Sequence, residues 1–326
     1  MEDLAERLRA AGYHLICASP YRSGLARGAH MLAAAILCRQ RYDLAIVDLY
    51  SGKAFLWGEA LAVLLTALRC PFAFVLRGGN LPDFARRWPK RVRACLARAS
   101  VVTAPSGYLL EEMRPYRNDI QLMPNPLNLS AYRFRLRLRP QPRLIWLRAF
   151  HEIYNPAMAP RVLGLLASHF PDVQLTMIGP DKGDGSWQRT EQTAVRLGVA
   201  GRISRPGGVP KIQIPACLEA GDIFLNTTNV DNTPVSVLEA MASGLCVVST
   251  RVGGVPYLLE DGQDALLVPP DDADAMALAI RRILTEPGLG ERLSRNARAK
   301  AERFDWPIVW PQWQALLAEI TRGRQP

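Results

Sequence analysis

Residues 231–244 hold the residue types that could bind an anion without a metal. They read Asp-Asn-Thr-Pro-Val-Ser-Val-Leu-Glu-Ala-Met-Ala-Ser-Gly. Thr233 is the predicted N-cap, Pro234 the predicted first helical residue and Gly244 the predicted stop of a short helix. The free backbone N–H groups and the positive end of the helix dipole would face the loop before Thr233. The segment therefore predicts a site for the diphosphate of a nucleotide.

Two carboxylates flank this predicted anion site. Glu239 follows Pro234 by five residues, which places it about 7.5 Å further along the helix axis, roughly the distance from a phosphate to a ribose. Asp231, in the preceding loop, would face a sugar attached to the diphosphate, where a carboxylate can bind hydroxyls or stabilise an oxocarbenium ion. The alternative is a purely structural capped helix, because two acids at this spacing are common.

The longer pattern around this helix resembles glycosyltransferase family 4. The resemblance is carried by residues 227–244, 247–250, 252–256, Gly262 and 266–270. It runs closely from about residue 144 to 305 and loosely from 12 to 135. It implies an α/β chain with the GT-B fold, in which two Rossmann-like domains face a cleft. It also implies a retaining transfer that uses no metal and no cofactor, with a UDP- or GDP-sugar as donor substrate.

The resemblance also assigns roles within the helix segment. The family has an acid-x7-acid motif across the donor, and Asp231 and Glu239 match its two positions. Glu239 would bind the ribose hydroxyls, and Asp231 would contact the donor sugar as the catalytic residue. Backbone N–H groups near Thr233, Val235 and Ser236 would hold the phosphates, while Pro234, which lacks an N–H, would only shape the turn.

A cation is expected beside the diphosphate, and Arg148 is the predicted one. It stands where the family has Gly-Arg, after the first strand of the second domain. The family follows this arginine with a lysine five residues on, whereas residues 153–156 read Ile-Tyr-Asn-Pro. The sequence leaves open whether His151 or a residue of the basic first domain takes the place of that lysine.

The length of 326 residues accommodates two domains of about 150 residues each. Short apolar runs between amphipathic helical patterns predict parallel sheets covered on both faces. The predicted strands are 44–49, 72–76, 101–104, 144–147, 173–178, 222–226 and 246–249. We predict an acceptor domain over 1–140, a donor-binding domain over 141–305, and a tail helix over 306–326 that packs across the junction. Residues 133–142, where Arg alternates with Phe and Leu, mark this boundary or form a solvated edge strand.

The start of the chain departs from the family pattern. Residues 1–12 resemble the end of the family's first helix, so the first domain is expected to be shorter by about one strand and a glycine-rich loop. Arg77, Gly78, Gly79 and Asn80 follow a predicted strand and could form part of an acceptor or phosphate loop. The alternative is that these four residues form only a turn.

Charge is distributed unevenly along the chain. Residues 1–140 contain 21 Lys and Arg against 10 Asp and Glu, whereas residues 141–326 contain 19 against 20. A basic first domain favours anionic partners, and residues 84–93 combine cations with Phe84 and Trp88 in a pattern that fits either a membrane interface or a solvated helix face. With no signal peptide and no apolar span, we expect a cytoplasmic protein, peripheral at the inner face of the plasma membrane, and no nucleic-acid partner.

Three functions are compatible with these patterns. The first is transfer of a sugar from a nucleotide-sugar donor to a glycan or lipid-linked acceptor, in envelope or exopolysaccharide synthesis. The second is a catalytically silent subunit that binds a sugar nucleotide. The shortened first domain and the missing lysine support this alternative, because both argue against turnover. The third is a sugar-nucleotide 2-epimerase, which shares the two-domain architecture but has no need of this motif.

Overall fold

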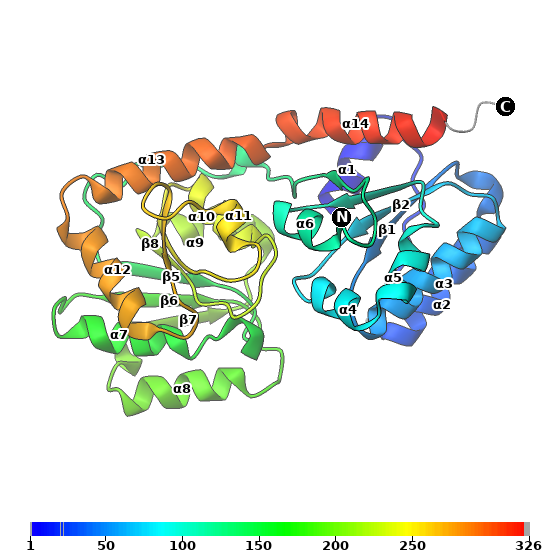
Figure 1. Ribbon diagram of the computed structural model, residues 1–326. Helices are drawn as coiled ribbons and strands as arrows, with labels where there is room; N and C mark the ends of the chain where they lie inside the picture. Colours follow the sequence, from blue (N-terminus) through cyan, green and yellow to red (C-terminus); the bar gives the residue numbers. More distant parts are fainter. Residues whose placement is uncertain (1, 20, 22, 323–326) are drawn as a thin grey trace. The chain divides into compact units, whose positions relative to one another are not determined.

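The computed structural model describes residues 2–19, 21 and 23–322, without the side chains of Glu2 and Arg322. The chain divides into two compact units, one formed by Met1–Met123 with Pro311–Pro326 and the other by Pro124–Trp310. Each unit has its own parallel β-sheet flanked by helices (Figure 1). The predicted α/β class, with two Rossmann-like domains, is confirmed.

Unit 1 contains a four-stranded parallel sheet in the order β1-β2-β3-β4. Its strands are β1 (Ala45–Leu49), β2 (Phe72–Leu76), β3 (Val101–Ala104) and β4 (Gln121–Leu122). Its helices are α1 (Glu2–Ala10), α2 (Gly24–Leu37), α3 (Lys53–Ala67), α4 (Leu81–Arg87), α5 (Pro89–Leu96) and α6 (Gly107–Met113). Strand β2 is buried along its whole length, which is the burial expected of a continuous apolar run in a sheet covered on both faces.

Residues 81–96 form two helices rather than one continuous helix. Helices α4 and α5 meet at Trp88, whose φ of −129° and ψ of 53° are not helical. Pro89 is the cause, because the ring of a proline disfavours helical geometry in the residue before it. The break leaves the Trp88 side chain exposed at the junction of the two helices.

Unit 2 contains a six-stranded parallel sheet in the order β10-β9-β8-β5-β6-β7. Its strands are β5 (Arg143–Leu147), β6 (Gln174–Ile178), β7 (Ile203–Gly207), β8 (Ile223–Asn226), β9 (Cys246–Thr250) and β10 (Ala265–Val268). Its helices are α7 (Met158–Ala167), α8 (Ser186–Arg196), α9 (Ile214–Glu219), α10 (Val235–Ala242), α11 (Val255–Leu258), α12 (Ala273–Thr285) and α13 (Leu289–Ala301). From β5 the chain adds strands on one side of the sheet, and from β8 it adds them on the other side. Open α/β sheets bind ligands at the point where the order of the strands changes in this way.

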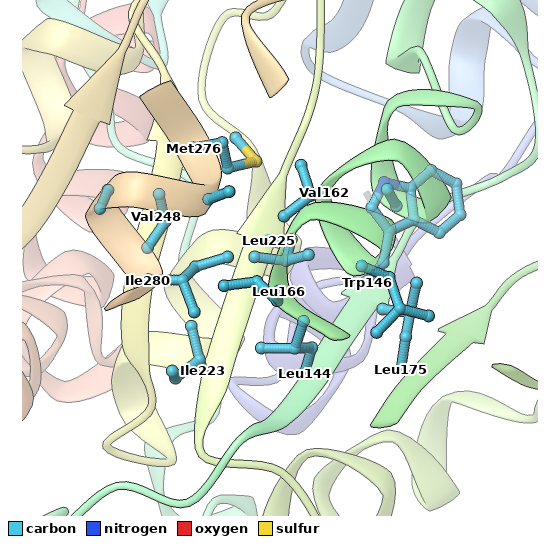
Figure 2. Close-up of a cluster of buried hydrophobic side chains, with 14 of the residues drawn as sticks. Leu144, Trp146, Val162, Leu166, Leu175, Ile223, Leu225, Val248, Met276 and Ile280 are labelled. Atoms are coloured by element: carbon cyan, nitrogen blue, oxygen red, sulfur yellow. The ribbon is translucent and has the colours of Figure 1, made fainter. Parts of the chain in front are cut away.

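Strand β5 separates two hydrophobic cores. Leu144 and Trp146 point into a cluster with α7 and α12, where Val162, Leu166, Met276 and Ile280 meet the sheet (Figure 2). Ile145 and Leu147 point to the opposite face, into a cluster with α9, α10 and α11. This alternation follows the two-residue period of a strand. Arg148 follows the carboxyl end of β5 and so lies at the edge of the sheet where open α/β sheets bind ligands.

The segment of residues 124–142 belongs to unit 2, so the division lies between Met123 and Pro124 rather than near residue 140. The reason is a buried ion network: Arg135 and Arg137 both contact Asp222, whose side chain is 2% exposed. Arg143 contacts the same carboxylate at 2.7 Å. The alternating arginines are therefore neither a linker nor a strand, and residues 1–123 alone hold 17 Lys and Arg against 10 Asp and Glu.

The predicted tail helix is α14 (Trp306–Arg322), with Pro311 inside it. Residues up to Trp310 group with unit 2 and the following residues with unit 1. Gln121 at the end of β4 donates a 3.0 Å hydrogen bond to Glu319 of this helix, within unit 1. Among the described residues, no helix has the length and hydropathy needed to traverse a lipid bilayer.

Candidate donor-binding site

Unit 2 contains a cavity of about 560 Å³ at the carboxyl ends of its central strands. Arg148 follows β5, Gly179 follows β6, and Ser236 and Glu239 come from α10. Its lining is completed by Leu147, Ala149, His151, Ile153, Tyr154, Ile178, Pro180, Lys182, Val209 and Ile214. The structure thus brings three of the predicted donor-binding residues, Arg148, Ser236 and Glu239, into one hollow.

Arg148 forms the central ion pair of the site. Its Nη2 contacts Oδ2 of Asp231, the predicted catalytic acid, and the two side chains are 18% and 12% exposed. Burial lowers the pKa of the Arg148 guanidinium, and the nearby Tyr154 and Glu239 act in the opposite direction. An arginine remains charged under such a shift, so the pair is a charged group held out of water.

The Nε atom of Arg148 is buried and has no hydrogen-bond partner among the described residues. The Tyr154 ring covers the guanidinium, with its centroid 4.5 Å from Cζ. A buried donor without a partner costs about 1–3 kcal/mol. A ligand oxygen in the cavity would remove that cost.

Helix α10 begins one residue later than predicted. Pro234, not Thr233, is the N-cap, because its ψ of 110° keeps it extended while its carbonyl accepts from the N–H groups of Val237 at 3.1 Å and Leu238 at 3.3 Å. The predicted first helical position of Pro234 is therefore wrong by one residue. The predicted stop is confirmed, since Gly244 directly follows the C-cap with a φ of +77°, a conformation that favours glycine.

The three residues predicted to offer backbone N–H groups differ in their surroundings. Ser236 is 6% exposed and lines the cavity, and its Oγ has no hydrogen-bond partner within the described part of the chain. Thr233 is 9% exposed and Val235 is 40% exposed, and neither side chain lines the cavity. Their suggested backbone contacts with phosphate stay predictions.

Glu239 occupies the next turn of α10 and is 7% exposed. Its Oε1 accepts a 2.7 Å hydrogen bond from the hydroxyl of Tyr132, which is 5% exposed. Tyr132 lies in the segment before β5, far from Glu239 in sequence, and no short motif pointed to it. The hydrogen bond fixes one carboxylate oxygen of Glu239 while the residue still lines the cavity.

The loop that carries Asp231 is held by two glycines after β9. A Cβ on Gly253 would lie 2.1 Å from the carbonyl oxygen of Asp231, and one on Gly254 would lie 1.9 Å from that of Asn232. The Gly254 N–H donates to the Asp231 carbonyl at 3.0 Å. The Gly-Gly pair at 253–254 therefore serves a close backbone approach that fixes the position of the acid.

Hydrogen bonds connect the loop after β8 to the loop after β5. Thr227 Oγ1 accepts from Trp146 at 2.9 Å and donates to the Tyr154 carbonyl at 2.7 Å. The Asn229 N–H donates to the Ile153 carbonyl at 2.8 Å. These bonds hold the two loops that present Asp231 and Arg148 to each other.

The other predicted residues lie outside this cavity. In unit 1, Arg77 follows β2 and its Nε contacts Asp48 at 2.9 Å, Gly78 has a φ of +82°, and Asn80 is the N-cap of α4. Gly79 lies between them in a turn. In the described ranges no three His, Cys, Asp or Glu side chains gather as metal ligands do.

Comparison with known families gives one match over unit 2. Residues 141–286 match the model of the family described as Glycosyl transferases group 1. This range includes the cavity and both acids of the 231–239 motif.

Curated relatives share the same kind of name. The chain is 28% identical over 299 residues to the GDP-mannose-dependent alpha-(1-6)-phosphatidylinositol monomannoside mannosyltransferase of Mycolicibacterium smegmatis, across 89% of this chain and 73% of that protein. It is also 28% identical over 204 residues to a D-inositol 3-phosphate glycosyltransferase of Streptomyces bingchenggensis, across 60% of this chain. That second match spans 44% of the relative, less than half of its length.

Solved structures share the fold. A crystal structure of Anabaena Alr3699/HepE in complex with UDP and glucose superposes with a TM-score of 0.76 at 19% sequence identity. The match covers 97% of this chain and 89% of that one. The predicted GT-B fold is thereby confirmed.

Proposed function

We propose that the chain is a retaining glycosyltransferase that uses a UDP- or GDP-sugar, because residues 141–286 match the family model described as Glycosyl transferases group 1. The observation that carries this proposal is the convergence of Arg148, Ser236 and Glu239 on one cavity, with two polar atoms that lack partners in the described structure. Those atoms, Arg148 Nε and Ser236 Oγ, are suited to bind a polyanion. No metal or cofactor is invoked.

Each part of the donor has a suitable partner in unit 2. The diphosphate suits the first turn of α10, which carries positive potential, and Arg148, whose buried Nε has no hydrogen-bond partner in the described structure. The ribose suits Glu239, because its carboxylate lines the cavity and carboxylates accept hydrogen bonds from hydroxyls. The transferred sugar suits Asp231, which the Arg148 ion pair and the Gly253–Gly254 approach hold in place.

In the reaction, the bond between the anomeric carbon and the diphosphate oxygen breaks, and the acceptor oxygen bonds to that carbon. The proton of the acceptor hydroxyl leaves with the departing diphosphate. Positive charge develops on the sugar while negative charge develops on the diphosphate. A carboxylate at Asp231 and a cation at Arg148 are therefore the charges that favour this transition state.

The test is a thermal-shift panel of UDP-, GDP-, dTDP- and ADP-sugars, followed by turnover with the stabilising donor. We expect one nucleotide class to raise Tm and acceptor-dependent product to form with the anomeric configuration of the donor. Absence of stabilisation by all four classes would exclude the donor site. Stable donor binding with no product for any acceptor would instead support a silent binding subunit, and an epimerised donor would support the epimerase.

We further propose a glycan or lipid-linked acceptor of envelope or exopolysaccharide synthesis, presented at an anionic membrane surface. Helices α4 and α5 support this, because Trp88 is 47% exposed between cations. Part of that charge is neutralised, since Arg86 pairs with Asp83 and Glu112 and Arg91 pairs with Glu59.

Flotation with vesicles tests the membrane contact. The protein should float with vesicles containing about a third anionic lipid and remain behind with neutral ones. Trp88→Ala should reduce flotation without changing donor turnover measured on a water-soluble acceptor. Equal flotation with both kinds of vesicle would contradict an electrostatic contact.

A further inference from the structure

We infer that Lys182 supplies the second cation of the diphosphate site, from the loop after β6. The expected lysine after Arg148 is missing, and Lys182 lines the same cavity as Arg148. This inference rests on the proposed donor site and assigns it one more binding residue, which no motif in the sequence indicated.

The backbone of Lys182 is fastened to the loop that carries Arg148. The Phe150 N–H donates to the Pro180 carbonyl at 2.9 Å, and the Lys182 N–H donates to the Phe150 carbonyl at 3.1 Å. Phe150 and Asp181 form a parallel β-bridge. The Lys182 main chain is therefore bonded to a residue two positions after Arg148, and both Lys182 and Arg148 line the cavity.

The Lys182 loop is held in shape by its own side chains. Asp181 Oδ1 accepts from the Gly183 N–H at 2.9 Å, which forms a tight turn directly at Lys182. The Asp184 carboxylate accepts from the N–H groups of Glu152 at 2.7 Å and Ser186 at 3.0 Å. These bonds tie the loop at both ends, so that little ordering of its backbone is required when a ligand binds.

The charges lining the cavity single out Lys182 as the free cation. Arg148 is already paired with Asp231, so this pair contributes little net charge. Lys182 is exposed, and no salt bridge joins its ammonium to any residue the structure describes. A nucleoside diphosphate carries two to three negative charges. Because Asp231 neutralises Arg148, a further positive group is needed to offset part of this charge.

His151 does not supply that charge. Its Nδ1 accepts a hydrogen bond from the Ile153 N–H at 3.2 Å, so this nitrogen is engaged by its own loop. The same Nδ1 lies 3.9 Å from Asp184 Oδ2, too far for a hydrogen bond.

Tyr154 explains why the lysine is in another loop. It is six residues after Arg148, next to the position where the family has its lysine, and its ring lies on the Arg148 guanidinium. This position after Arg148 therefore contributes an aromatic ring, which lies on the guanidinium, rather than an ammonium. The second cation at this cavity comes instead from the loop after β6, the neighbour of β5.

The test compares nucleotide affinities of the full chain and its variants by calorimetry. The probes are either UDP and UMP or GDP and GMP. The pair is chosen to match the nucleotide class that raises Tm in the thermal-shift panel. Lys182→Ala should weaken diphosphate binding about 10-fold, the lower end for losing a bond to a charged group because the side chain is exposed. Monophosphate binding should change less, so the ratio of the two affinities should fall. Lys182→Arg should restore most of the loss, and Lys182→Glu should increase it.

Lys211→Ala is the matched control, because Lys211 is also an exposed lysine of unit 2 but does not line the cavity. It should leave both affinities unchanged. If the unmodified chain binds a nucleoside diphosphate and Lys182→Ala binds it equally well, the assignment of Lys182 is wrong while the donor site stands. If the unmodified chain binds none of the four probes, the donor site itself is wrong.

Discussion

The hydroxyl of Tyr132 donates a 2.7 Å hydrogen bond to Oε1 of Glu239, and both side chains are buried. The contact joins the segment before β5 to the helix that presents the carboxylate. The bond therefore fixes the orientation of the Glu239 carboxylate, which lines the cavity.

Replacement of Tyr132 by phenylalanine removes this bond and keeps the aromatic ring. We expect a loss of about 1.5–3 kcal/mol in the free energy of unfolding, the range for a hydrogen bond to a charged group. Nucleoside diphosphate affinity should fall as well, because the carboxylate is no longer held in one orientation. Chemical denaturation and calorimetry measure the two effects. Tyr13→Phe, at a half-exposed tyrosine of unit 1, is the control and should change neither.

Glu239→Ala should lower kcat/KM for the donor by about 10-fold to 150-fold, equivalent to losing about 1.5–3 kcal/mol of charge-assisted hydrogen bonding. The loss should concern the nucleotide part, so UDP or GDP binding should weaken in parallel. Circular dichroism establishes that the variant is folded. An unchanged kcat/KM in a folded variant would remove Glu239 from the donor site.

Asp231→Asn should separate binding from turnover. The substitution releases Arg148 from its anionic partner, so the affinity for a nucleoside diphosphate should stay equal or rise by about threefold to tenfold. Sugar transfer should fall at least about 100-fold, as expected for losing a charge that stabilises the transition state. Calorimetry with the diphosphate and product formation from the full donor give the two values. Parallel loss of both would mean that Asp231 serves only to hold Arg148.

Gly254→Ala tests the close approach beneath the Asp231 loop. The added Cβ would lie 1.9 Å from the Asn232 carbonyl oxygen, so the loop must shift at a cost of about 1–3 kcal/mol. Transfer should fall more than diphosphate binding does. Gly201→Ala is the matched control, since a Cβ there meets nothing within 4 Å and the backbone φ is not in the left-handed region. Equal stability of the two variants would contradict the steric argument.

The Asp184 carboxylate gives the Lys182 loop a defined pH dependence. Hydrogen bonds from Ser186 and from the Glu152 N–H hold the pKa of Asp184 well below its ordinary value. A carboxyl with a lowered folded-state pKa stabilises the fold above its unfolded pKa of about 4, and this contribution is lost as the pH falls through the folded-state value. The difference in Tm between the unmodified chain and Asp184→Asn should therefore be constant above about pH 5 and shrink below pH 4. A difference that grew on acidification would refute this sign.

Much of the fold could be predicted because its signals are local. Strand β2 was bounded correctly from the apolar run at 72–76, and the helix segment after residue 233 was placed within one residue. Edge strands such as β7 (Ile203–Gly207) escaped, because polar and glycine residues interrupt the apolar pattern there. The ends of helices α4 and α5 depended on one proline whose effect a periodicity count does not register.

The sequence could predict only the part of the site that lies within one continuous segment. Asp231, Ser236 and Glu239 lie within nine residues and share a helix start, so spacing was informative. The Asp222 partners Arg135 and Arg137 and the Glu239 partner Tyr132 are 85 or more residues away in sequence. Lys182 likewise reaches the cavity only through the pairing of β5 with β6. Alternating arginines and phenylalanines could not show which distant carboxylate they would meet.

The arginines around Asp222 have a consequence for dissecting the protein. A fragment that starts at residue 141 keeps every strand and helix of unit 2, yet it discards Tyr132, Arg135 and Arg137. Asp222, 1% exposed, would then retain Arg143 as its only ion-pair partner among those the structure describes, and Glu239 would lose its tyrosine. The shortest autonomous nucleotide-binding piece should therefore begin at Pro124, and the buried residues before 141, namely Leu127, Leu129, Tyr132 and Arg137, should tolerate substitution as poorly as a protein interior does.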